Sequence, residues 1–170
     1  MGLSIAIAGG IMMFTFVYVM MTLPGIVDKT ISITDASSDI TKIEDSITKT
    51  IMDVNSISAS VGSQVITFSI DNSGTEKLWN YQKFNVIITY KGTSATQTES
   101  LVYYGSCSGS PPSGYWCLDS ISNDNFEPKI LNTGETLNVK STVSQNAQTG
   151  AIAVIVSADN GVTSSRTTTI

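Results

Sequence analysis

The sequence contains no histidine, only two cysteines and a single arginine among its 170 residues. It therefore lacks the commonest general base and metal ligand, and two cysteines cannot build a four-ligand zinc site. Only 14% of residues are charged, and acidic residues outnumber basic ones by 14 to 9. Nucleic-acid binding needs clustered Lys and Arg, so this balance argues against a nucleic-acid partner.

Catalytic signatures are missing as well. The chain has no Gly-x-Ser-x-Gly, no His-Glu-x-x-His and no glycine-rich phosphate loop. A short stretch rich in oxygen ligands fits no EF-hand spacing, so calcium is the minority interpretation there. Its members are Asp119, Asn123, Asp124, Asn125 and Glu127. We expect no enzyme activity, no cofactor and no metal.

The most informative feature that the sequence does contain is a first segment without charged residues. Residues 1–27 contain no charged side chain, and a helix of that length spans about 40 Å, which exceeds a hydrocarbon core of about 30 Å. No Lys or Arg precedes Lys29, whereas a cleaved secretory signal needs a basic start, so we expect the segment to be retained. We predict a kink at Pro24. The residues predicted to face lipid or a helix bundle are Leu3, Ile7, Ile11, Phe14, Phe16, Val17 and Met21.

Beyond Pro24 the apolar residues recur at steps of three or four, which indicates one face of a helix. Residues 1–60 are therefore predicted to form one long kinked helix, apolar over 3–27 and amphipathic over 28–58. The apolar face of the second half needs a partner, which is either the chain's own carboxyl-terminal domain or a neighbouring copy. This face consists of Ile40, Ile43, Ile47, Ile51 and Val54.

Residues 61–170 change to the two-residue period of strands. The Asn160-Gly161 pair predicts a tight hairpin turn of type I′, in which both central residues have positive φ. Many short strands with such turns predict an immunoglobulin-like sandwich, so the fold class is α+β, pilin-like, with a long hydrophobic helix before an all-β domain. The seven predicted strands are 65–70, 84–90, 96–104, 115–122, 136–143, 151–158 and 162–169.

Cys107 and Cys117 flank a loop rich in Ser, Gly and Pro, and we predict a disulfide between them in an oxidising compartment. The aromatic residues around this loop are either contact anchors for a partner or a cover for one edge of the sandwich. They are Tyr103, Tyr104, Tyr115 and Trp116. A second aromatic group, at the start of a strand, is predicted to be core: Trp79, Tyr81 and Phe84.

Several segments resemble the archaeal flagellin-like family, which is related to type IV pilins. Residues 2–8 (GLSIAIA) resemble a class III signal junction, where cleavage falls between Gly2 and Leu3. Residues 68–77 (FSIDNSGTEK), 79–90 (WNYQKFNVIITY), 125–132 (NFEPKILN) and 133–137 (TGETL) are most similar to the archaellum stator-type proteins F and G.

The resemblance implies a cell-surface protein of an archaeon, with its helix in the cytoplasmic membrane or a filament core and its β domain outside. It implies a stator role that anchors the archaellum to the S-layer. The implied partners are related pilin-like subunits through the helix, the S-layer protein, the motor's membrane platform and the membrane itself.

The basic residues that usually precede the cleavage glycine are missing, which fits a membrane-retained stator better than a polymerised subunit. Two alternatives stay open. One is a filament subunit, either an archaellin or an adhesive pilin. The other is a membrane-anchored recognition module that binds a surface polysaccharide or protein through the 103–116 loop.

Overall fold

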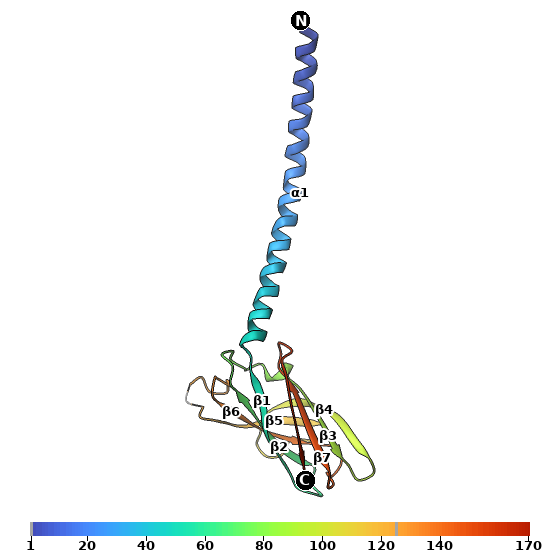
Figure 1. Ribbon diagram of the computed structural model, residues 1–170, viewed down its shortest axis with the longest axis vertical. Coiled ribbons are helices and arrows are strands. Elements are labelled where there is room, and N and C mark those ends of the chain that lie inside the picture. The colour runs from blue at the N-terminus through green and yellow to red at the C-terminus, as the bar shows by residue number, and fades with distance from the viewer. Residues whose placement is uncertain (1, 125) are drawn as a thin grey trace. The chain divides into compact units, whose positions relative to one another are not determined.

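The structure is a computed structural model that describes residues 2–124 and 126–170 of the chain. These residues form a long helix followed by an all-β domain, in the predicted order (Figure 1). The chain divides into two compact units, one ending at Glu44 and the other comprising Asp45–Ile170. The last turn of the helix therefore belongs with the β unit.

Helix α1 (Gly2–Lys49) runs through Pro24 without a break. Proline has no N–H group, so the Met20 carbonyl lacks the backbone donor that residue 24 would otherwise provide. Pro24 therefore does not end the helix, and the predicted bend at this residue stays a prediction. The Thr15 hydroxyl donates to the Ile11 and Met12 carbonyls, at 3.0 and 2.9 Å, and so needs no partner outside the helix.

The predicted helix was too long at its carboxyl end. It ends at Lys49 rather than near residue 58, and Met52–Ala59 form strand β1. Val54 is therefore not on a helix face: it pairs with Ile70 in the sheet and is 4% exposed. Ile51 is not helical either. It lies between α1 and β1, and its carbonyl accepts hydrogen bonds from the loop that follows β2.

A β-bulge explains this error. The β1–β2 register shifts between Val54 and Ile57, so that two apolar residues three positions apart both lie against the core. A regular strand would place such residues on opposite faces, whereas a helix places them on the same face. The bulge therefore gives a strand the residue spacing of a helix, and the β domain begins well before residue 61.

All seven predicted strands are present. They are β2 (Val65–Asn72), β3 (Asn85–Lys91), β4 (Thr96–Ser106), β5 (Tyr115–Ser122), β6 (Thr136–Thr142), β7 (Ala151–Ser157) and β8 (Thr163–Thr169). A short 3-10 helix, η1 (Tyr81–Lys83), precedes β3. Among the described residues the strand order is β1-β2-β6-β5-β4-β3-β7-β8.

Strand β4 joins two antiparallel ladders. Its first half pairs antiparallel with β3, and its second half, from Val102 to Ser106, pairs parallel with β5. The two end strands of the order also meet, because the Val54 N–H donates to the Ser164 hydroxyl at 3.0 Å. The sheet therefore curls around one core, whose largest fully buried side chains include Trp116, Tyr90, Ile66 and Leu137.

Two sequence predictions about this domain are wrong in part. Tyr81 and Phe84 are core residues as predicted, but Trp79 is 63% exposed. The turn between β7 and β8 is present, yet only Gly161 of the Asn160-Gly161 pair has positive φ, at 87°, so the turn is not of type I′. Asn160 instead directs its side-chain amide at the end of α1.

Candidate functional site

The apolar half of α1 is one candidate contact surface. All seven residues that the sequence predicts to face lipid or a bundle lie on this helix and are exposed within the single chain: Leu3, Ile7, Ile11, Phe14, Phe16, Val17 and Met21. Among the described residues, α1 is the one helix that is long and apolar enough to cross a membrane. An exposed apolar surface of this extent indicates contact with lipid or with other helices. The predicted cleavage junction, between Gly2 and Leu3, lies at the start of α1, and its cleavage stays a prediction.

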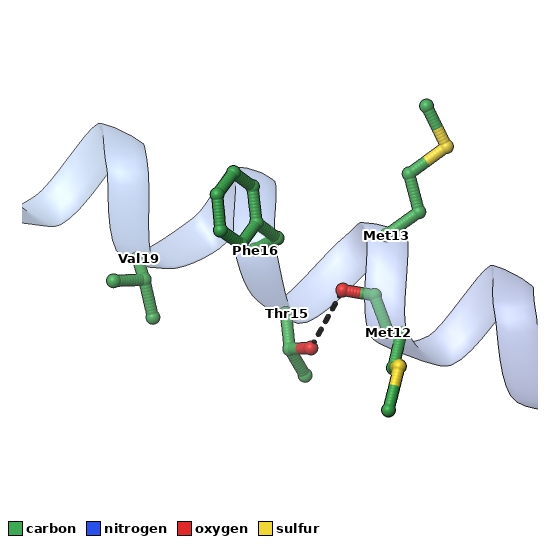
Figure 2. A pocket seen from close by; sticks show the side chains of 5 residues that line it. All are labelled: Met12, Met13, Thr15, Phe16 and Val19. Atoms are coloured by element: carbon green, nitrogen blue, oxygen red, sulfur yellow. Dashed lines mark hydrogen bonds between the residues drawn. The ribbon is translucent and has the colours of Figure 1, made fainter.

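Figure 2 shows the part of this surface where long side chains surround a shallow hollow. Met12, Met13, Phe16 and Val19 contribute apolar atoms, and Thr15 is turned back to the Met12 carbonyl. Methionine adapts to irregular neighbours because its side chain is unbranched and flexible. The hollow is thus suited to another apolar helix or to lipid chains, and it holds no group for chemistry.

The second half of α1 carries the predicted amphipathic face, which is shorter than predicted because Ile51 and Val54 lie beyond the end of the helix. Ile40, Ile43 and Ile47 are on the helix as predicted, and each is more than 40% exposed. The Lys49 ammonium donates to the Asp45 carboxylate at 2.6 Å, and this bond raises the pKa of Lys49. The apolar face that the three isoleucines form is therefore exposed in the single chain.

The end of α1 is fastened to the β domain by backbone groups. The Lys49 carbonyl accepts from the N–H groups of Thr75 and Glu76 at 2.8 and 3.1 Å, and the Ile51 carbonyl accepts from Ser73 and Gly74 at 2.9 and 3.0 Å. The bonds to Lys49 satisfy a carbonyl that the helix end would otherwise leave without a partner, and the bonds to Ile51 fasten the residues that follow the helix. The sequence indicates a turn at residues 71–74, after β2. It does not show that this turn bonds to the end of α1.

Two buried or half-buried asparagines hold the junction together. The Asn72 amide donates to the carbonyls of Glu76 and Leu131, at 2.8 and 3.0 Å, and its side-chain oxygen accepts from Gly74. The Asn160 amide donates to the hydroxyls of Ser46 and Thr50, at 3.1 and 2.7 Å. The last helical turn is therefore part of the folded domain and not a linker.

The disulfide between Cys107 and Cys117 is present, with a Cα–Cα distance of 5.2 Å. It fixes the end of β4 to β5, where the Cys107 N–H also donates to the Leu118 carbonyl at 2.8 Å. The prediction of a staple around the 108–116 loop is confirmed.

The aromatic group near the staple divides into a buried and an exposed half. Trp116 is fully buried, so it is a core residue and not a contact anchor. Tyr103 packs against it with the two rings tilted and their centres 4.7 Å apart, and burial raises the pKa of Tyr103. Tyr104 and Tyr115 lie outside, ring edge to ring face at 5.8 Å, beside exposed Val102. The candidate contact surface therefore shrinks to these last three residues.

The described oxygen ligands of the acidic stretch do not converge. Asp119 pairs with Lys140, Glu127 pairs with Lys77, and Asp124 accepts from a backbone N–H. In the part of the chain that the structure describes, no three His, Cys, Asp or Glu side chains are grouped to hold a metal ion. Asn125 lies outside the described residues.

No protein-family model matches the chain, and no curated protein sequence matches it. Solved structures do match. A chain of the archaellum periplasmic stator protein complex FlaF and FlaG from Sulfolobus acidocaldarius aligns over 69% of this chain and 87% of its own length, at 17% identity and a TM-score of 0.50. Archaeal flagellin FlaB1 from Methanocaldococcus jannaschii aligns over 71% of this chain and 89% of its own, at 8% identity and a TM-score of 0.52.

At these identities the likeness is one of fold. It agrees with the resemblance that the sequence segments indicate, because one matched protein is named as an archaellum stator protein complex and the other as an archaeal flagellin. The chain has a long apolar helix and a β domain whose fold is similar to that of these proteins.

Proposed function

We propose that this chain is a stator-type subunit of an archaellum, held in the cytoplasmic membrane by α1, with its β domain outside the membrane and attached to the S-layer. The observation that supports this most is the combination of an exposed, uncharged helical segment with a β domain whose fold is similar to that of a periplasmic stator protein. The two ladders that share β4 support the immunoglobulin-like class for this domain.

In this proposal, α1 is held in the membrane because its apolar side chains are buried there, away from water. Each large apolar side chain that leaves water contributes roughly 1.5–3 kcal/mol, and the apolar half of α1 exposes more than ten of them. The total of tens of kcal/mol exceeds what reversible attachment needs. The membrane platform of the motor is then a neighbour of the same helix.

A filament subunit is the second candidate, and the similarity to archaeal flagellin FlaB1 favours it. In that role α1 would be processed between Gly2 and Leu3 and buried in a filament core instead of lipid. The two roles use the same apolar surface and differ in copy number, processing and location.

Cell fractionation with mass measurement of the amino terminus separates these roles. The stator proposal predicts an uncleaved chain in few copies, recovered with membranes after the cells are sheared. Abundant sheared filaments composed of a chain that begins at Leu3 would overturn it in favour of the filament subunit.

A set of substitutions tests the anchor itself. Aspartate at Ile11, Phe14, Phe16 and Val17 together places four charges in the apolar segment, each costing roughly 2.5–3.5 kcal/mol besides the lost burial, and should release the chain from membranes while the β domain stays folded. Leucine at the same four positions is the matched control, because it keeps the segment apolar. Retention of the four-aspartate variant in membranes would contradict the anchoring role of α1.

A further inference from the structure

The sequence contains one Asn-Gly pair, Asn160-Gly161, and an asparagine before glycine is the most readily deamidated kind. The Gly161 nitrogen can attack the Cγ atom of Asn160 and close a five-membered succinimide ring, because glycine has no Cβ atom to hinder the approach. The Gly161 proton leaves with the side-chain nitrogen as ammonia. Water then opens the ring at either of its carbonyls, which gives aspartate or isoaspartate.

The end of α1, residues 46–50, holds the side chain of Asn160 in place. The Asn160 amide nitrogen donates to the hydroxyls of Thr50 and Ser46, at 2.7 and 3.1 Å. The Thr50 hydroxyl in turn donates to the Ser46 carbonyl at 2.8 Å, and Thr50 is only 4% exposed. The acceptors that Asn160 meets are therefore themselves fixed, and rotation of its side chain toward Gly161 breaks its bonds to them.

The turn between β7 and β8 holds the attacking nitrogen. The Gly161 N–H donates to the Ala158 carbonyl at 3.0 Å, and the Val162 N–H donates to the side-chain oxygen of Asn160 at 3.2 Å. Ring closure needs rotation about the backbone and the side chain of Asn160, which breaks these bonds too. The protection thus comes from the turn and from α1, and the α1 part is lost when the helix end separates locally from the domain.

Deamidation would weaken this junction permanently. The side chain of the product has no N–H donor, so both bonds to the hydroxyls are lost in their present sense. The Ser46 carbonyl, 3.4 Å from the amide nitrogen, would face a carboxylate oxygen, and the new charge would be adjacent to Asp159. The Thr50 hydroxyl can donate to the carboxylate only by giving up the Ser46 carbonyl. Isoaspartate also adds a carbon atom to the backbone of the turn.

We propose that Asn160 is a modification site whose deamidation is blocked while the end of α1 is docked and proceeds when it separates from the β domain. The product then keeps the junction weakened, because the amide does not re-form spontaneously. The inference goes beyond the proposed function and does not depend on it, since Ser46, Thr50 and Asn160 all belong to one compact unit.

Peptide mass spectrometry measures the reaction. The full-length chain in detergent is incubated at mildly alkaline pH, well below its melting temperature, and a parallel sample is incubated in enough urea to unfold the β domain. Trypsin releases residues 141–166, a peptide that also contains Asn146 as an internal reference. Asn160 of the wild type should deamidate at least about tenfold more slowly in the folded chain than in urea.

The variant Ser46→Ala, Thr50→Val removes both hydroxyl acceptors and leaves the turn unchanged. It should raise the deamidation rate of Asn160 in the folded chain roughly 10- to 30-fold, the factor that corresponds to two hydrogen bonds of ordinary strength. The matched control is Ser32→Ala, Thr41→Val, which makes the same two changes at exposed positions of α1. It should leave the rate unchanged.

Two further variants separate the junction from the rest of the domain. Replacing Cys107 and Cys117 by serine destabilises the domain away from the junction, and it should leave the deamidation rate below the melting temperature unchanged. Asn160→Asp mimics one product and should melt about 5 °C below Asn146→Asp, which makes the same charge change at an exposed asparagine.

Four results would overturn the inference. They are a wild-type chain that deamidates as fast when folded as in urea, a Ser46→Ala, Thr50→Val variant no faster than the wild type, an equal acceleration in either control, and equal melting of Asn160→Asp and Asn146→Asp. None of them would affect the fractionation result, so failure of this inference is distinguishable from failure of the proposed stator role.

Discussion

Gly74 is the residue where the junction between α1 and the β domain is most sensitive to a small change. A Cβ atom at this position would come closer than 3.0 Å to two backbone atoms, the Lys49 carbonyl oxygen and the Ile51 nitrogen. Backbone cannot move aside as the end of a flexible side chain can. Gly74→Ala must therefore displace the loop that bonds to Lys49 and Ile51.

The expected loss of stability follows from the number of hydrogen bonds that the displaced loop breaks. Four N–H groups of residues 73–76 donate to the Lys49 and Ile51 carbonyls, and loss of two or three of them costs about 2–3 kcal/mol, at about 1 kcal/mol each. For a domain of this size that lowers the melting temperature by about 10 °C. Asn72, which holds the loop from inside, cannot follow the displacement because it is itself buried.

Thermal unfolding of the full chain in detergent measures this effect, followed by tryptophan fluorescence, to which buried Trp116 and exposed Trp79 both contribute. Gly109→Ala is the matched control: its Cβ meets nothing within 4 Å and its φ is not positive, so it should melt with the wild type. If Gly74→Ala melted within about 2 °C of the wild type, where about 0.5 kcal/mol is the corresponding loss, the tight junction would be refuted.

Further predictions concern the β domain. Replacing Cys107 and Cys117 by serine should lower the free energy of unfolding by about 3 kcal/mol, because the disulfide closes a loop in the unfolded chain. Chemical denaturation measures this loss, and an unchanged free energy of unfolding would contradict the prediction. Trp116→Ala should cost about 3–5 kcal/mol in the same experiment, as expected for a large core side chain, whereas Tyr104→Ala should cost less than about 0.5 kcal/mol. Burial raises the pKa of Tyr81, so its stabilising effect is complete below about pH 10 and is lost as the pH rises further. The alkaline unfolding midpoint should therefore be higher in Tyr81→Phe, and an unchanged midpoint would contradict this.

The strands could be predicted because their apolar residues alternate and their ends carry turn residues. Strand β1 could not, because its bulge places Val54 and Ile57 three residues apart on one face, which is the spacing of a helix. The staple was predictable from two cysteines on either side of a loop. Local sequence alone cannot reveal which neighbour strand a residue meets.

The aromatic residues illustrate that limit. Trp116 and Tyr115 are adjacent in sequence, yet one is fully buried and the other is at the surface, because successive residues of β5 face opposite sides of the sheet. The phase of that alternation depends on the pairing of β5 with β4 and β6. Likewise, the role of Asn160 depends on Ser46 and Thr50, which are more than a hundred residues away.

The staple also limits how far the domain can be stretched. Because Cys107 and Cys117 are ten residues apart, a chain pulled from both ends cannot release the segment between them until the sulfurs separate. Because ten residues at about 3.4 Å each are replaced by a Cα–Cα span of 5.2 Å, the fully extended length is shorter by about 29 Å. A surface subunit that experiences tension would thus reach its taut state earlier when oxidised than when reduced, and a single-molecule pulling trace would record that difference directly.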